Sequence, residues 1–283
     1  MKDCREEWYD KDAKVAVTIV DVTSAAQELA RGHLAGPTST RFLTEALASV
    51  ALLGAEMSEK DETVILQMKC KGPLGGFNVE CTSEGTLRGY AEKKILDDFD
   101  GMGKPDSRKV IGEAQYQVTR SVPGRILSQG ISTSIDGYLA DSLQRKACIR
   151  TEVAVSDEVE VLEARGVMVE ILPDSKIGSL GSVGSEGLVG IERAVASEGV
   201  GRLTLYDPKD PIRLSVASRN ILKQLGLENA ELRKTTPLRF ACRCSPDRAI
   251  AMLAALSEEE RKALPPTIDI TCHMCGRTYT VKV

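Results

Sequence analysis

Histidine is nearly absent from this sequence. Only His33 and His273 occur among its 283 residues. Histidine is the side chain that most often moves protons in enzymes, so acid–base or triad chemistry has little material here. The glycine-containing stretch DGMGKP (100–105) also lacks the Ser or Thr that follows the lysine of a phosphate-binding P-loop. We therefore predict that the chain is not an enzyme.

Aromatic residues, long apolar runs and excess positive charge are also scarce. Aromatic residues make up 4% of the chain, so we expect an aliphatic core. No apolar run approaches the ~20 residues of a membrane-spanning helix, and residues 1–14 are charged, unlike a secretory signal. The formal net charge of −4 argues against a broad surface for polyanions. These absences predict a cytoplasmic protein that binds no membrane.

An α+β core is predicted for residues 1–175. Apolar and β-branched runs divided by glycine turns favour strands, and the long apolar stretch at 39–57 favours a helix with Thr or Ser as its N-cap. An antiparallel meander is expected at 62–94, with GPLGGF (72–77) as a hairpin turn. The other predicted elements are strands at 15–22, 113–120 and 147–155, a polar loop at 97–109, a helical stretch at 136–147, and one or two strands at 159–173.

Residues 176–233 are predicted to form a helical linker of marginal stability. The segment opens with glycines spaced three residues apart and separated by serines, which is typical of a flexible connector. Two amphipathic stretches follow, at 187–199 and 211–227, and both are too short to bury much surface alone. We expect such a linker to unfold once a neighbouring unit stops supporting it.

Residues 234–283 contain four of the eight cysteines in two close pairs. Cys242 and Cys244 form a C-x-C pair, and after 27 intervening residues Cys272 and Cys275 form a C-x-x-C pair. The predicted order of elements in this segment is strand, cysteine turn, helix, strand, cysteine turn, strand. Two close pairs are typical of a tetrahedral Zn²⁺ site with four sulfurs at ~2.3 Å. Because so short a unit has little core, metal binding would be coupled to its folding. Four sulfurs leave no position for a catalytic water, so the site is structural or regulatory.

Several charged and polar residues flank the predicted site. His273 lies inside the second pair, and we expect it to face solvent rather than to replace a cysteine ligand. Three nearby cations either offset the negative charge of a Zn–Cys₄ centre or belong to an ordinary charged surface, and the sequence leaves both alternatives open. These cations are Arg243, Arg248 and Arg277.

The remaining cysteines lie far from these two pairs in the sequence. We predict that Cys70, Cys81 and Cys148 are small buried apolar residues. Cys4 lies in a charged segment and is expected to be exposed. None of the four is assigned to the zinc site.

The close spacing of the pairs also permits redox chemistry. Cysteines two or three residues apart can oxidise with each other once the metal is lost, and a disulfide cannot hold Zn²⁺ as thiolates do. Oxidation would then remove what folds the tail. A purely structural zinc ribbon would have the same four sulfurs, so chemistry alone leaves a redox switch and a static site as alternatives.

The sequence resembles the heat-shock protein 33 family of redox-regulated holdase chaperones. The resemblance rests on the C-x-C and C-x-x-C pairs near the end of the chain and on three longer stretches. HLAGPTSTRFLTEALASVALLGAEM (33–57) is similar to a family helix that follows a Pro-Thr turn. LQMKCKGPLGGFNVECTSEGTLRGYAE (66–92) is similar to its turn and RGY strand, and FACRCSPDRAIAMLAALSEEE (240–260) to the start of its zinc domain.

The resemblance implies a specific cycle. The reduced, inactive form would hold one Zn²⁺ on Cys242, Cys244, Cys272 and Cys275. Oxidant would form Cys242–Cys244 and Cys272–Cys275 disulfides, the tail and linker would unfold, and the exposed apolar surface would bind unfolding client proteins without ATP under oxidative stress. The active form would be a homodimer. The implied units are a client-binding and dimerisation core at 1–175, the linker at 176–233 and the redox-switch zinc domain at 234–283.

The sequence also leaves two alternative functions open. A nucleic-acid-binding zinc-ribbon protein is the main alternative, because residues 234–283 contain eight Lys and Arg against five Asp and Glu. Only Phe240 and Tyr279 are available there for base stacking, and the rest of the chain is acidic, which disfavours it. An enzyme is the weaker alternative for want of histidine.

Overall fold

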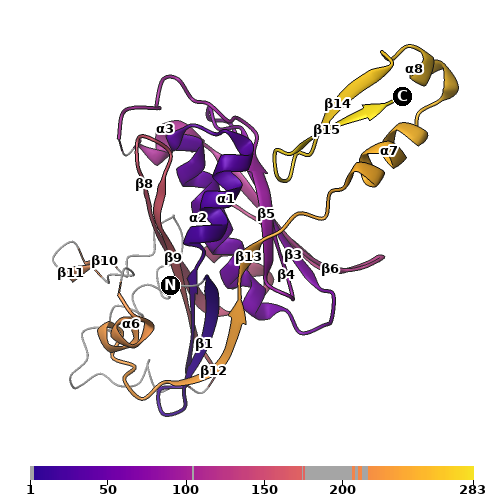
Figure 1. The fold of residues 1–283 in the computed structure, drawn as a ribbon. Coiled ribbons are helices and arrows are strands. Elements are labelled where there is room, and N and C mark those ends of the chain that lie inside the picture. The colour runs from indigo at the N-terminus through magenta and orange to yellow at the C-terminus, as the bar shows by residue number, and fades with distance from the viewer. Residues whose placement is uncertain (1–2, 104, 174, 176–205, 208–209, 212–215) are drawn as a thin grey trace.

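Two β-sheets pack around two helices (Figure 1). The computed structural model describes residues 3–103, 105–173, 175, 206–207, 210–211 and 216–283. Sheet A is antiparallel throughout, in the order β12–β1–β2–β9–β8. Its strands are β12 (Glu231–Pro237), β1 (Cys4–Asp10), β2 (Val15–Asp21), β9 (Val161–Ile171) and β8 (Lys146–Val155).

Sheet B has the order β13–β5–β4–β3–β6–β7. All its neighbouring strands are antiparallel except β13 and β5, which are parallel. Its strands are β13 (Arg239–Phe240), β5 (Thr86–Ala91), β4 (Gly76–Thr82), β3 (Thr63–Cys70), β6 (Ala114–Val122) and β7 (Arg125–Ser132). The two sheets are joined near the end of the chain, because Leu238 alone separates β12 in sheet A from β13 in sheet B.

The helix α2 (Pro37–Leu53) lies between the two sheets and contacts β8 and β9 on one side and β4 and β5 on the other. It is buried on almost every side, as expected of a helix that is apolar all round. The predicted Thr or Ser cap is wrong: the N-cap is Gly36 and Pro37 occupies the first helical position. The Asp100 carboxylate accepts a hydrogen bond from Thr38 N at 3.0 Å, so a distant loop satisfies this helix end.

The core is divided into three clusters of unequal size. The largest joins α1 (Thr23–His33), α2 and the facing sides of both sheets. A second covers the other face of sheet A, where α6 (Ser218–Gln224) packs over residues that include Trp8 and Val17. The third lies in the tail and has only Ala249, Leu253 and Val281 fully buried. So small a core gives the tail little hydrophobic stability of its own.

The predicted α+β class is confirmed, and so are most of its elements. The strand at 15–22, the meander at 62–94 with its hairpin turn, the strands at 113–120 and 147–155 and the helix at 39–57 all match described elements. Residues 159–173 form the single strand β9. The loop at 97–109 is largely irregular, although α3 (Ser107–Ile111) begins inside it.

Other predictions were wrong or fell short. The helical stretch at 136–147 is limited to α4 (Ile135–Gly137) and the π-turn η2 (Tyr138–Ser142), because Lys146 already begins β8. The short η1 (Gly54–Glu56) follows α2. The elements β1, α1 and β7 were not predicted at all.

The linker prediction is only partly within the described residues. The stretch at 187–199 lies outside them. Of the stretch at 211–227, α6 is helical, and a small two-stranded ladder precedes it, formed by β10 (Tyr206–Asp207) and β11 (Asp210–Pro211). The strand β12 pairs with β1 and crosses the boundary predicted between residues 233 and 234. The division into three domains stays a prediction.

The tail follows the predicted order. After β13 come the first cysteine turn, two helices, and a hairpin whose connection is the second cysteine turn (Figure 1). The helices are α7 (Pro246–Ala254) and α8 (Glu258–Lys262), and the hairpin strands are β14 (Thr267–Thr271) and β15 (Thr278–Lys282).

Candidate metal centre

The first cysteine turn lies between β13 and α7. Ser245 follows Cys244 directly and caps the helix, because its Oγ accepts a hydrogen bond from Arg248 N at 3.2 Å. Pro246 then takes the first helical position, where its missing N–H costs nothing. The sequence Cys-Ser-Pro therefore ends the extended segment sharply and leaves the two thiols on a short, well-defined turn.

The second cysteine turn closes the β14–β15 hairpin. Gly276 N donates to Cys272 O at 2.8 Å, and Cys272 N donates to Arg277 O at 2.9 Å. Gly276 has φ +72°, a left-handed conformation that favours glycine. The tight loop thus brings Cys272 and Cys275 close to each other.

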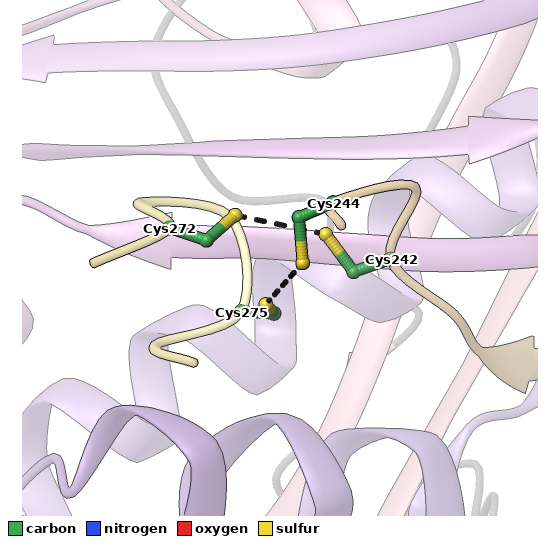
Figure 2. A group of neighbouring side chains, drawn as sticks. All are labelled: Cys242, Cys244, Cys272 and Cys275. Carbon is green, nitrogen blue, oxygen red and sulfur yellow. Dashed lines mark hydrogen bonds between the residues drawn. The ribbon is translucent and has the colours of Figure 1, made fainter. Parts of the chain in front are cut away.

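The four sulfurs of the two turns meet at one point (Figure 2). All four Sγ atoms lie within 4.8 Å of one another. Cys242 Sγ is 3.7 Å from Cys272 Sγ, and Cys244 Sγ is 3.4 Å from Cys275 Sγ. Four sulfurs at ~2.3 Å from a tetrahedral ion would be about 3.8 Å apart, so the arrangement fits a metal ion with four thiolate ligands. His273 is exposed and outside this group.

The sulfurs differ in how readily they become thiolates. Burial raises the pKa of the Cys242 thiol, but hydrogen bonds from the Cys244 backbone and from Arg88 outweigh it and lower the pKa to about 7. Burial is the main reason that the pKa values of Cys272 and Cys275 are raised. A metal ion bound by all four would have to replace those protons.

Arg88 is a functional residue that sequence reasoning missed. Its Nη1 donates to Cys242 Sγ at 3.6 Å, and its other contact is a salt bridge with the buried Glu80. The same Glu80 oxygen accepts from Arg243 Nη2 at 2.7 Å. Arg88 lies in the stretch at 66–92, whose resemblance to the family rests only on its turn and RGY strand. Its distance of 154 positions from Cys242 hides the contact from any local pattern.

The three arginines predicted near the site differ in their contacts and exposure. Arg243 pairs with Glu80 and links the first cysteine turn to β4. A hydrogen bond with Tyr279 raises the pKa of Arg277, which lies on the second turn. Arg248 is exposed on α7, as an ordinary surface residue would be. Arg88, which donates a hydrogen bond to the Cys242 sulfur, thus comes from the core rather than from the tail.

The second cysteine turn is seated directly on the core. Gly89 N in β5 donates to Met274 O at 3.2 Å, and His33 Nε2 is 2.8 Å from Gly89 O. A Cβ at Gly276 would lie 1.9 Å from Gly32 O. The second cysteine turn and the end of α1 therefore approach more closely than a residue with a side chain at position 276 would permit. His273 meets the ring of Tyr90 edge to face at 5.8 Å. The metal centre and the core therefore share an interface.

The other four cysteines lie elsewhere. Cys81 and Cys148 are buried as predicted, and burial raises their pKa values to about 11 and about 12. Cys70 is only half-buried, contrary to expectation, and Cys4 is half-buried rather than exposed. All eight cysteines are free thiols in this structure.

The two aromatic rings on which the nucleic-acid alternative depends are partly buried in this structure. Phe240 packs against the main core cluster. Tyr279 packs on the small tail core, and its hydroxyl lies 3.1 Å from Cys244 Sγ. Both rings are thus partly occupied by packing within the protein, which disfavours base stacking. Among the described helices, none is long and apolar enough to cross a membrane.

Comparison with known proteins gives one consistent result. The family model described as Hsp33 protein matches residues 7–282. A 33 kDa chaperonin of Thermus thermophilus is 28% identical, with 93% of this chain and 79% of that protein covered. A 33 kDa chaperonin of Oceanobacillus iheyensis is 25% identical, with 99% and 96% covered.

Solved structures agree on the fold. The crystal structure of the 33 kDa chaperonin (heat shock protein 33 homolog) from Thermotoga maritima aligns with a TM-score of 0.79. The alignment covers 100% of this chain and 95% of that one, at 21% identity. At this identity the likeness shows the fold alone.

Proposed function

Because this chain belongs to the Hsp33 family, whose model matches residues 7–282, we propose that it is a molecular chaperone switched on by oxidation of its four tail cysteines. It would hold unfolding proteins without ATP and keep them from aggregating. The observation that carries the proposal is the meeting of four sulfurs at the interface between tail and core. Because the sulfurs lie at this interface, their oxidation would change the contact between the tail and the core.

Zinc is the metal that this donor set favours. Four thiolates in tetrahedral reach are typical of structural Zn²⁺ sites. The residues that would hold the ion are Cys242, Cys244, Cys272 and Cys275. The bound ion would supply cross-links between the two turns that the three buried residues of the tail core cannot replace.

Oxidation removes the ligands in pairs. Two thiolates give two electrons and form one disulfide, while one hydrogen peroxide accepts those electrons, and its O–O bond breaks to give two hydroxide ions. Two peroxides therefore convert all four thiolates into two disulfides and leave no thiolate to hold a metal ion. Resemblance to the family assigns the bonds as Cys242–Cys244 and Cys272–Cys275. In this structure the sulfurs in contact belong to opposite turns, so peptide mapping of the oxidised chain must distinguish the two pairings.

Loss of the tail would expose apolar surface. The linker helix α6 has seven residues, too few to be stable alone, and it relies on packing over sheet A. Where α6 leaves, residues such as Trp8 and Val17 become accessible. The proposal thus assigns client binding and homodimerisation to residues 1–175, the switch to 234–283 and the transmission to 176–233. It also places the protein in the cytoplasm.

The test follows metal and chaperone activity together. Purified reduced protein is treated with peroxide while a chromogenic chelator reports released zinc and light scattering reports aggregation of a heat-labile client. Zinc release and suppression of aggregation should rise in parallel. Reduced protein without stoichiometric zinc, or zinc release with no change in client aggregation, would contradict the proposal.

The double variant Cys272→Ser with Cys275→Ser gives the matched control. It should bind no zinc tightly, because two of the four ligands are gone. The pair Cys70→Ser with Cys81→Ser removes two thiols outside the four-sulfur group and should leave zinc content unchanged.

A further inference from the structure

The outer edge of β5 is paired with the tail of the chain. Arg239 N donates to Gly85 O at 3.0 Å, and Ala241 N donates to Leu87 O at 3.0 Å. Further along the same edge, Gly89 N donates to Met274 O. Backbone groups from both sides of the cysteine centre thus cover this sheet edge, while β4 satisfies the other side of β5.

The segment that covers the edge also fills two apolar positions. Leu238 is 5% exposed and belongs to the main core cluster, and Phe240 packs against the same cluster. Arg239 lies between them and is exposed, as alternate residues of a strand must face opposite sides. The edge therefore accepts an extended segment with apolar side chains at positions i and i+2.

The pairing of β13 with β5 ends directly before the first cysteine turn. The strand β13 is only two residues long, and Cys242 follows one residue after Ala241. If the tail unfolds, only two backbone hydrogen bonds and the packing of Leu238 and Phe240 remain to hold this segment on β5. An uncovered sheet edge is a template for another extended chain. The opposite edge strand, β7, differs because it ends sheet B already and exposes Ile126 and Ile131 without any change in the tail.

We propose that the uncovered edge of β5 is a client-binding surface, at which an extended segment of an unfolding protein takes the place of residues 238–241. This inference rests on the proposed function, since it needs the tail to leave. The client adds a strand beside β5 through backbone hydrogen bonds, and its apolar side chains at i and i+2 enter the positions of Leu238 and Phe240. Apolar residues at every second position are common in the β-strands of proteins. The backbone hydrogen bonds do not depend on which residues lie between them. The surface therefore suits many clients.

The chain supplies its own probe for this surface. A fluorescent peptide of residues 236–242, with Cys242→Ser, should bind the peroxide-treated full-length protein and not the reduced protein. Two isomers of identical mass then test the backbone bonds. N-methylation at Ala241 removes the N–H that is donated to Leu87 O. N-methylation at Phe240 removes an N–H that points away from β5, since successive N–H groups of a strand face opposite sides.

We expect the two methylated peptides to differ in their affinity for the oxidised protein. The Phe240-methylated peptide should bind within about threefold of the parent, and the Ala241-methylated peptide at least about tenfold more weakly. Excess parent peptide should also restore client aggregation in the light-scattering assay, and the Ala241-methylated isomer should restore much less. Equal binding of the two isomers, or full chaperone activity at saturating peptide, overturns the inference.

A second measurement keeps the two proposals separate. Hydrogen exchange of the Gly89 amide should accelerate on oxidation, as its bond to Met274 O is lost, and slow again when a client is added. Suppression of aggregation without renewed protection at residues 86–91 would leave the chaperone proposal standing and refute the edge as its surface. Failure of the oxidised protein to suppress aggregation at all would refute the proposed function itself.

Discussion

At the scale of single residues, Arg88 connects the chemistry of the sulfurs to the core. It is 15% exposed at its side chain, and it contacts both Glu80 and Cys242. A charge-assisted hydrogen bond to a metal-ligating sulfur stabilises the thiolate and orients it. Hydrogen bonds from the Cys244 backbone and from this guanidinium together outweigh burial and lower the pKa of Cys242 to about 7, which favours its thiolate form.

Replacement of Arg88 should weaken zinc binding. In Arg88→Gln the charge beside Cys242 is lost, and zinc affinity should fall by about 10- to 100-fold, as for other groups that support a metal ligand. The pKa of Cys242 would rise, so the affinity of the variant should begin to decline at a higher pH than that of the wild type as pH is lowered. Chelator competition from pH 6 to 9, in roughly half-unit steps, measures both effects.

The control for this variant is Arg248→Gln, which removes an exposed arginine from the same tail. It should change zinc affinity by less than about threefold. Equal losses in the two variants would mean that Arg88 acts only through general charge and not through its hydrogen bond.

At the scale of elements, the second cysteine turn and α1 meet without room for a side chain. Gly276→Ala places a methyl group 1.9 Å from Gly32 O, so the turn cannot seat on α1 as it does now. The reduced variant should keep its zinc, exchange the Gly89 amide at least about tenfold faster, and release zinc at a lower peroxide concentration. Hydrogen exchange and chelator titration measure these outcomes.

A second glycine variant distinguishes the effect of the lost contact from the effect of backbone strain. Gly124 has φ +78°, close to the φ of Gly276, but a Cβ there would meet nothing within 4 Å. Gly124→Ala should therefore show the strain of a left-handed alanine, on the order of 1 kcal/mol, and leave Gly89 exchange unchanged. If both variants behave alike, the seating of the turn on the core has no part in the switch.

Local sequence patterns predicted the four cysteines but not their neighbours. Short spacing brings Cys242 to Cys244 and Cys272 to Cys275 whatever the rest of the fold does. The strand β1 was missed because its sequence, CREEWYD, looks solvated, although Arg5 is 1% exposed and donates to Ala51 O. Its pairing with β12 joins residues more than two hundred positions apart. A single sequence carries no periodicity that signals such long-range contacts.

At the scale of the whole molecule, α6 packs on sheet A, whereas the second cysteine turn contacts β5 of sheet B. Leu225 is fully buried at the end of this helix, in the cluster that contains Trp8. Leu225→Ala should cost about 2–5 kcal/mol of packing and release α6 from the sheet. In the reduced, zinc-loaded variant the edge of β5 stays covered, so suppression of client aggregation without peroxide should be partial and should come from the surface beneath α6 alone.

Trp8 makes this outcome measurable, because it is the only tryptophan in the chain and is buried beneath α6. Its emission should shift to longer wavelength in Leu225→Ala and stay unchanged in the control Leu162→Ala, which alters a leucine that is 60% exposed on β9. A red shift without chaperone activity would exclude the surface beneath α6 as a client site.

The position of Leu238 between the two sheets has a consequence for recovery. β12 pairs with β1 through residues up to Pro237, so a tail unfolded by oxidation would stay tethered within a few residues of the β5 edge. Once the reduced cysteine turns refold, the short tether gives the segment a local concentration in the millimolar range, far above that of any client in solution. After reduction, the returning strand therefore competes with the bound client as an intramolecular ligand. Client release would then need no nucleotide, only the reductant that restores four thiols.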